Sequence, residues 1–183
     1  MRYSADKLAR IAAHQHGRVT TAQLHAAGVG KQRIARWVAS GRLHREHVGV
    51  YAVGHPGRTV LADCVSAVLA AGDGAVISHR SAAHLLGLRR GAPPAPEVTV
   101  PTLDGRARPG VVIHRVRALH PLDVSELHGI ALTTVPRTLL DLAPASAPEA
   151  LTRACHEAWV HHRAGPVEIE AAIARNPRMP RAG

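Results

Sequence analysis

Residues 31–54 have the sequence KQRIARWVASGRLHREHVGVYAVG, and this stretch decides the fold of the N-terminal part of the chain. On a helix, Ile34, Trp37 and Val38 fall on one side and form an apolar stripe that faces a core. Gly41 follows directly, and glycine is the usual residue just beyond the end of a helix. The spacing therefore predicts a short amphipathic helix over residues 31–40.

The elements on either side of this helix complete a recognisable order. Leu43–Glu46 and Val50–Val53 are typical of two short strands joined by a tight turn. Upstream, one helix is predicted to end before Gly17, and a second starts after Thr20, with Gln23 in the position of a capping box. Three helices followed by a hairpin within residues 1–55 predict a winged helix-turn-helix domain.

Positive charge is concentrated in this predicted domain. The chain of 183 residues carries a formal net charge of +10, and its pI is near 11.3. Residues 1–55 hold nine Lys or Arg against two acidic residues, which gives them +7 of that total. A local excess of this kind favours a polyanionic partner, most often nucleic acid.

The polar side chains of the predicted domain suggest how it would bind double-stranded DNA. Arg can recognise guanine and Gln adenine in the major groove, while the preceding helix and the wing contact the backbone or the minor groove. The candidate DNA-binding residues are Lys31, Gln32, Arg33, Arg36 and Ser40 on the third helix, Thr20, Thr21 and Gln23 at the start of the second, and Arg42, His44, Arg45 and His47 on the hairpin. Two other interpretations remain: a solvated basic face, and a winged helix that binds protein.

The mixture of helices and strands over residues 58–175 predicts a second domain of mixed α/β type. The predicted fold class of the chain is therefore α/β (α+β). His55–Gly57 forms the boundary, and residues 176–183 have no apolar period and are expected to be frayed. Helices are predicted over residues 58–71, 78–86, 134–142, 148–162 and 167–174, and strands over 75–77, 97–100, 111–116 and 130–133, with a turn-rich stretch over 101–110. Ser78 is the expected cap of the second of these helices.

The motifs expected of an enzyme are missing from the sequence. Glu168 and Glu170 resemble a nuclease carboxylate pair, but no lysine follows them, and no Gly-Ser turn with spaced aspartates suggests a nucleotidyltransferase. His79, Ser81 and Asp141 have the residue types of a catalytic triad without any spacing that supports one. Arg137 and Asp141, four residues apart on a predicted helix, are expected to form a surface or partly buried ion pair. We expect no enzymatic activity.

No metal or cofactor site is expected either. Cys64 and Cys155 lie on apolar helical stripes and are predicted to be reduced core thiols, as in a cytoplasmic protein. The fourteen histidines form no zinc-finger or HExxH spacing. The sequence has neither a long apolar span nor a secretion signal, so no membrane association is predicted.

Four segments of the chain resemble one known family. GRVTTAQLHAAGVGKQRIARWVASGRLHREHVGVYAVGHPG, residues 17–57, resembles the N-terminal winged-helix domain of the AbiEi antitoxins of type IV toxin–antitoxin (abortive infection) systems. ISHRSAAHLLGL, VTVPTLDGRARPGVVIHR and GIALTTVPRTLLDLA resemble the segment that follows in actinobacterial members. Together the resemblance covers about residues 5–175.

The resemblance implies a function for each part of the chain. It implies that the N-terminal domain binds operator DNA and represses its own operon, through Lys31, Gln32, Arg33 and Arg36 and through a wing over Arg42–Tyr51. It implies that the remainder supports antitoxicity against a nucleotidyltransferase-like toxin encoded beside it.

The sequence departs from the family at two points. Val48 stands at a hairpin-tip position where relatives often carry a basic residue. Many relatives also continue into a domain resembling very-short-patch-repair endonucleases, which would begin at about the end of this chain. An alternative function is therefore the DNA-targeting portion of such a nuclease protein.

Overall fold

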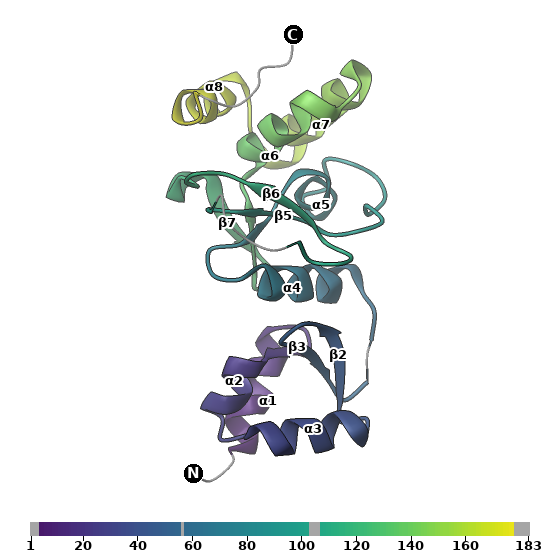
Figure 1. Cartoon of the computed structure of the whole chain (residues 1–183). Coiled ribbons are helices and arrows are strands. Elements are labelled where there is room, and N and C mark those ends of the chain that lie inside the picture. Colours follow the sequence, from purple (N-terminus) through teal and green to yellow (C-terminus); the bar gives the residue numbers. More distant parts are fainter. Residues whose placement is uncertain (1–3, 56, 103–106, 178–183) are drawn as a thin grey trace.

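The fold was analysed in a computed structural model, which describes residues 4–55, 57–102 and 107–177 (Figure 1). The described elements form a three-stranded sheet near the N-terminus and a five-stranded sheet in the rest of the chain. Helices and strands alternate in both parts, so the predicted mixed α/β fold class is confirmed.

The N-terminal region has the predicted order of helices and strands and forms a winged helix-turn-helix. Its elements are α1 Ala5–His14, β1 Arg18–Thr20, α2 Thr21–Ala26, α3 Lys31–Ala39, β2 Leu43–His47 and β3 Val50–Val53. The strand β1 was not predicted; it pairs antiparallel with β3, on the side opposite β2. Val19, Leu24, Ile34 and Leu43 are buried together in the core that the helices and strands enclose.

A capping box starts α2 as the sequence predicts. The Thr20 hydroxyl accepts a hydrogen bond from the Gln23 backbone N–H, and the Gln23 side chain accepts one from the Thr20 N–H. Two backbone donors that a helix leaves without partners are satisfied in this way. The cap fixes the point where β1 turns into α2.

The C-terminal region folds around a mixed five-stranded sheet with the order β6-β5-β4-β8-β7. Its strands are β4 Val76–Ile77, β5 Glu97–Val100, β6 Val112–Arg115, β7 Val124–Leu127 and β8 Ile130–Thr133. Its helices are α4 Val60–Ala71, α5 His79–Leu85, α6 Val135–Leu142, α7 Pro148–His162 and α8 Pro166–Arg175, with single 3-10 turns at Pro121–Asp123 and Ala143–Ala145. The pairs β5–β6 and β4–β8 are parallel, and the pairs β4–β5 and β7–β8 are antiparallel.

Helices cover both faces of this sheet (Figure 1). One core cluster joins α4 to the strands, with Val65, Ile77 and Val98 as members, and a second joins α5, α6 and α7. Cys64 is buried in the first cluster and Cys155 lies beside the second, and neither is in a disulfide. Among the described residues, none of the helices combines the length and apolar character that a bilayer span requires.

Three sequence predictions for this region need correction. The strand β7 was missed, and the Ser78 side chain makes no capping hydrogen bond but accepts one from the Thr99 hydroxyl. Asn176 is not frayed, because its side-chain amide donates to Asp123. Residues 178–183 of the predicted tail and residues 103–106 of the predicted turn-rich stretch lie outside the described residues.

Arg137 and Asp141 form a fully buried pair rather than one at the surface. Arg137 is only 1% exposed, and its Nε donates to Asp141 Oδ1 at 2.9 Å. Its Nη1 donates to the side-chain oxygen of Asn176 and lies 3.9 Å from Asp123 Oδ2. A buried guanidinium needs partners of this kind, which α8 supplies from outside the local sequence.

A second buried ion pair connects the two regions. Arg18 on β1 is 3% exposed and donates to both carboxylate oxygens of Glu46 on β2, at 3.1 and 2.7 Å. It also donates to the carbonyl of Gly57, directly before α4, and Glu46 accepts a short hydrogen bond from Ser66 on α4. His16 lies 2.9 Å from the carbonyl of His128 in the C-terminal region. These contacts fix the wing against α4 and hold the turn before β1 beside the turn between β7 and β8.

We predict that Arg18→Met lowers the free energy of unfolding by about 3–5 kcal/mol, because it leaves the Glu46 carboxylate without its buried partner. Equilibrium denaturation in urea measures this loss. Arg58→Met is the matched control, since the Arg58 side chain is 83% exposed in its pair with Asp63. That control should change stability by less than about 1 kcal/mol. Equal losses in the two variants would contradict a structural role for Arg18.

Candidate nucleic-acid interface

The helix α3 lies at one end of the molecule. Ile34 is buried against the N-terminal core, and Trp37 and Val38 pack against it, so the predicted apolar face is confirmed. Figure 1 shows α3 on the side of the N-terminal region that faces away from the C-terminal sheet and its helices. The face of α3 opposite its apolar stripe is therefore open to a large partner.

The candidate residues of α3 and its surroundings differ in exposure. Arg33 is half-buried and has an interaction partner within the protein. Exposed candidates are Lys31, Gln32, Arg36, Ser40, Arg42 and Arg45. The first turn of α3 contains no acidic side chain. The exposed ridge, defined here by these six residues, thus carries four cationic side chains and one amide.

Contacts with aromatic rings orient two arginines of the exposed ridge. The Arg42 guanidinium lies 4.8 Å from the centroid of the Trp37 ring, and the Arg45 guanidinium lies 5.7 Å from that of Tyr51. Cation–π contacts at these distances restrict long side chains without neutralising their charge. Both cations stay exposed and remain available to an anionic ligand.

The start of α2, by contrast, is occupied by contacts within the protein. The Thr20 hydroxyl and the Gln23 amide close the capping box, and Gln23 also donates to the Gln15 side chain. The Thr21 backbone N–H and hydroxyl both donate to the carbonyl of Gly49. All three side chains are half-buried and take part in these hydrogen bonds, so the exposed ridge does not include them. Their contact with phosphate stays a prediction.

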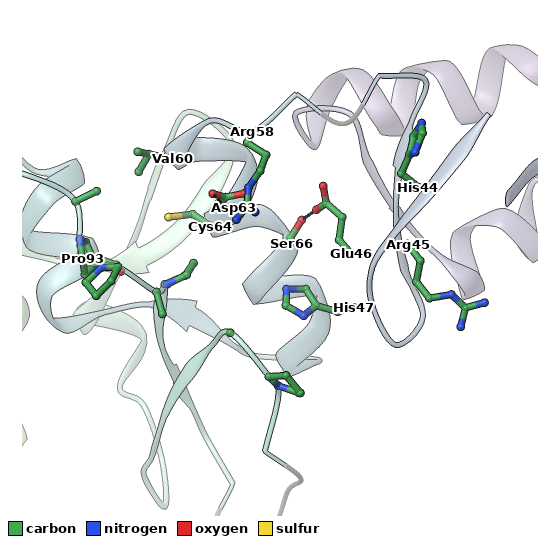
Figure 2. Close-up of a pocket in the computed structure, with 17 residues that line it drawn as sticks. His44, Arg45, Glu46, His47, Arg58, Val60, Asp63, Cys64, Ser66 and Pro93 are labelled. Atoms are coloured by element: carbon green, nitrogen blue, oxygen red, sulfur yellow. Dashed lines mark hydrogen bonds and ion pairs between the residues drawn. The ribbon is translucent and has the colours of Figure 1, made fainter. Parts of the chain in front are cut away.

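The wing is divided between the two sides of the hairpin. Figure 2 shows Glu46 and His47 directed toward α4, and Arg45 directed the other way. A bulge between Arg45 and His47 interrupts the register of β2 with β3 at this point. His44 is half-buried, and the exposed tip carries Val48. Arg45 and Arg42 are the two wing candidates that remain well exposed.

His47 instead lines a groove between the wing and the C-terminal region, with a volume of about 560 Å³. Arg58, Asp63, Cys64 and Ser66 line the same groove. Burial lowers the pKa of His47; Glu46 raises it in part, and Arg108 adds to the lowering. The His47 side chain thus faces the protein and not the exposed ridge, and its contact with DNA stays a prediction.

The fold also assembles a polar cluster that the sequence did not predict. His79 at the start of α5, Glu97 on β5 and His114 on β6 offer ligand atoms within 4.8 Å of one another. The sequence predicts no metal site, because these residues are far apart along the chain. The parallel register of β5 with β6 places Thr99 opposite His114, with Glu97 nearby. A sequence analysis that knew this register could have predicted the cluster.

The surroundings set the protonation states of this cluster. Burial lowers the pKa of His79 to about 3, with a further contribution from His114. Burial raises the pKa of Glu97, but hydrogen bonds from His114 and Arg80 outweigh it and hold that pKa below its usual value. Burial raises the pKa of Asp141 to about 6 against the opposing charge of Arg137. His79 is 3.9 Å from Asp141, whereas the Ser81 hydroxyl accepts a hydrogen bond from the Glu97 backbone N–H, so no Ser-His-Asp triad forms.

Comparison with known proteins finds a family match in the N-terminal region. Residues 6–54 match the family described as "Transcriptional regulator, AbiEi antitoxin". No curated protein matches the chain significantly. Among solved structures, the crystal structure of the RV2827C protein from Mycobacterium tuberculosis is similar at 16% sequence identity and a TM-score of 0.47. The match covers 95% of this chain and 82% of that one.

The family match coincides with the elements that the structure shows. It begins in α1 and ends just after β3, so it contains the three helices, the hairpin and the whole exposed ridge. Residues 6–54, about a quarter of the chain, are thus similar to the AbiEi antitoxin family of transcriptional regulators.

Proposed function

We propose that the N-terminal region is a DNA-binding domain through which the protein represses its own operon. The observation that carries the proposal is the exposed ridge, on a winged helix-turn-helix that matches a family of transcriptional regulators. In this arrangement α3 enters the major groove, and Arg36 and Gln32 recognise base edges. Lys31, Arg42 and Arg45 contact phosphates on either side.

The division of the wing supports a binding mode centred on α3. Glu46 and His47 contact or face α4, so one side of the hairpin is unavailable to DNA. Arg45 and Arg42 face solvent and flank α3. Val48 at the tip provides no charge for a minor-groove contact. We propose a duplex that lies along α3 and touches the wing at its base.

For the C-terminal region, we propose a separate domain over residues 58–175 that supports antitoxicity. The support for the division is that the N-terminal core and the two C-terminal cores consist of different residues. The support for an antitoxin role is the description of the family that residues 6–54 match. We propose that the protein acts within a type IV toxin–antitoxin system, in the cytoplasm and without enzymatic activity of its own. Co-expression with a nucleotidyltransferase-like toxin encoded beside it tests this role: growth should be restored.

We predict a steep salt dependence of DNA binding. If four to six phosphates are neutralised, log K should fall against log [salt] with a slope of about −4 to −5. Fluorescence anisotropy with a duplex from the upstream region of its own gene measures this slope. A flat dependence would rule out the proposed ridge as the binding surface.

Arg36→Ala should weaken operator binding by about 1–3 kcal/mol and relax the preference for operator over random DNA, if Arg36 recognises a guanine. Competition between the two duplexes measures both effects. Arg117→Ala, an exposed arginine in the C-terminal region, is the matched control and should leave both quantities unchanged. An equal loss on random DNA would make Arg36 a phosphate contact instead.

Thr20→Ala distinguishes a capping role from a DNA contact. Loss of the cap should lower the free energy of unfolding by about 1 kcal/mol. Operator affinity, measured well below the unfolding temperature, should stay within about twofold of wild type, since the hydroxyl is held by Gln23. A large loss of affinity without loss of stability would return Thr20 to the interface.

A further inference from the structure

His79, Glu97 and His114 lie together on the side of the C-terminal sheet that α5 covers. The Glu97 side chain is 4% exposed, that of His79 is 19% and that of His114 is 31%. The three come from a helix start and two neighbouring parallel strands, so they are positioned by elements with few degrees of freedom. Two imidazoles and one carboxylate form a donor set typical of divalent transition metals.

The distances within the cluster are close to those between ligands of one ion. Glu97 Oε2 and His114 Nε2 are 2.9 Å apart. With metal–ligand distances of about 2.0–2.2 Å, two ligand atoms of one tetrahedral zinc ion are separated by about 3.3–3.6 Å, so these two atoms would move apart by about half an ångström on binding. The His79 and His114 rings stack with their centroids 3.4 Å apart and their planes at 10°. Because the nitrogen lone pairs lie in the ring planes, one ring has to turn about its Cβ–Cγ bond before both nitrogens face the same ion as the carboxylate.

Groups of the kind found around metal ligands are also nearby. Arg80 donates to Glu97 Oε1 and leaves Oε2 for the ion. Asp141 Oδ2 is fully buried, has no hydrogen-bond partner and lies 3.9 Å from His79 Nδ1, which is 3.0 Å from Ser78 Oγ. A carboxylate behind a metal-binding histidine commonly accepts its second N–H and fixes the tautomer. A turn of the His79 ring toward Asp141 would give the orphaned oxygen this role.

The backbone of His79 is in an uncommon conformation. His79 has φ +50, a left-handed conformation that it shares with His16, His128 and Arg163 among the described non-glycine residues. Such conformations concentrate at functional sites, where the surrounding structure holds them in place. Here the conformation accompanies the stacking of the His79 ring on His114, next to Glu97.

We propose that His79, Glu97 and His114 bind one divalent transition-metal ion, of the class that Zn²⁺ represents. The ion would join α5, β5 and β6 through protein ligands. With three such ligands, a fourth position stays open to water or an external ligand, as the partial exposure of His114 permits. The site belongs to the C-terminal region and does not depend on DNA binding.

Isothermal titration of the full chain, free of affinity tags, with ZnCl2 tests the proposal. We expect one ion per chain and a thermal unfolding midpoint that rises by about 5–10 °C at a free zinc concentration of about a hundred times Kd. His114→Gln and His79→Asn should each weaken binding by more than the roughly 10–100-fold typical of an outer-shell change. Asn is chosen at position 79 because it tolerates a positive φ.

A competing surface site supplies the matched control. His161 and Glu157, exposed at i,i+4 on α7, lie 3.1 Å apart and could bind zinc weakly. His161→Gln should leave the stoichiometry and affinity unchanged. Circular dichroism without metal establishes that each variant is folded.

Chemical modification of the wild-type chain provides a measurement that needs no variant. Zinc should protect His114 from diethyl pyrocarbonate, mapped by mass spectrometry, while His161 continues to react. Absence of binding by the wild-type chain, binding lost only in His161→Gln, or no protection of His114 would each overturn the proposal.

Discussion

The buried guanidinium of Arg18 is the constraint on which the arrangement of the two regions depends. A cation that is 3% exposed has to satisfy its donors within the protein, and Arg18 does so with Glu46, the His16 carbonyl and the Gly57 carbonyl. These partners belong to β2, the turn before β1 and the segment before α4. One side chain thereby ties the wing, the rest of the small sheet and the start of the C-terminal region together. Ser66 on α4 extends the network through Glu46.

This constraint determines which basic side chains are left for a ligand. Because Glu46 is held toward α4, its neighbour Arg45 is directed to the other side of the hairpin, over Tyr51 (Figure 2). His47, two residues from Arg45 at the bulge, enters the groove beside α4. On the side of the domain that carries α3, Lys31 and Arg36 stay exposed. Together with Arg42 and Arg45 they present positive charge on α3 and at the base of the wing.

The sequence predicted elements whose signals are local and missed features that depend on distant pairing. The apolar stripe of α3, the Thr20 capping box and the hairpin all follow from residues within a few positions of one another, and the structure contains them. The strands β1 and β7 were missed because each is short and is defined by its partner. The exposure of Gln32 and Arg36 was predictable, because it follows from the apolar stripe of the same helix. The position of His47 beside α4 was not, because no residue near His47 in the sequence signals a contact with α4.

The buried polar network of the C-terminal region shows how such distant pairing bears on function. Arg137, Asp123, Arg175 and Asn176 satisfy one another across α6, α8 and the turn before β7. Asp141 belongs to this network through Oδ1, but its Oδ2 is one of only three buried side-chain polar atoms without a partner in the described part of the chain. Folded proteins leave few such atoms, because each costs the full desolvation penalty of a polar group. That oxygen lies where the network meets His79, so an imidazole N–H held by a bound ion would complete a network that is otherwise closed.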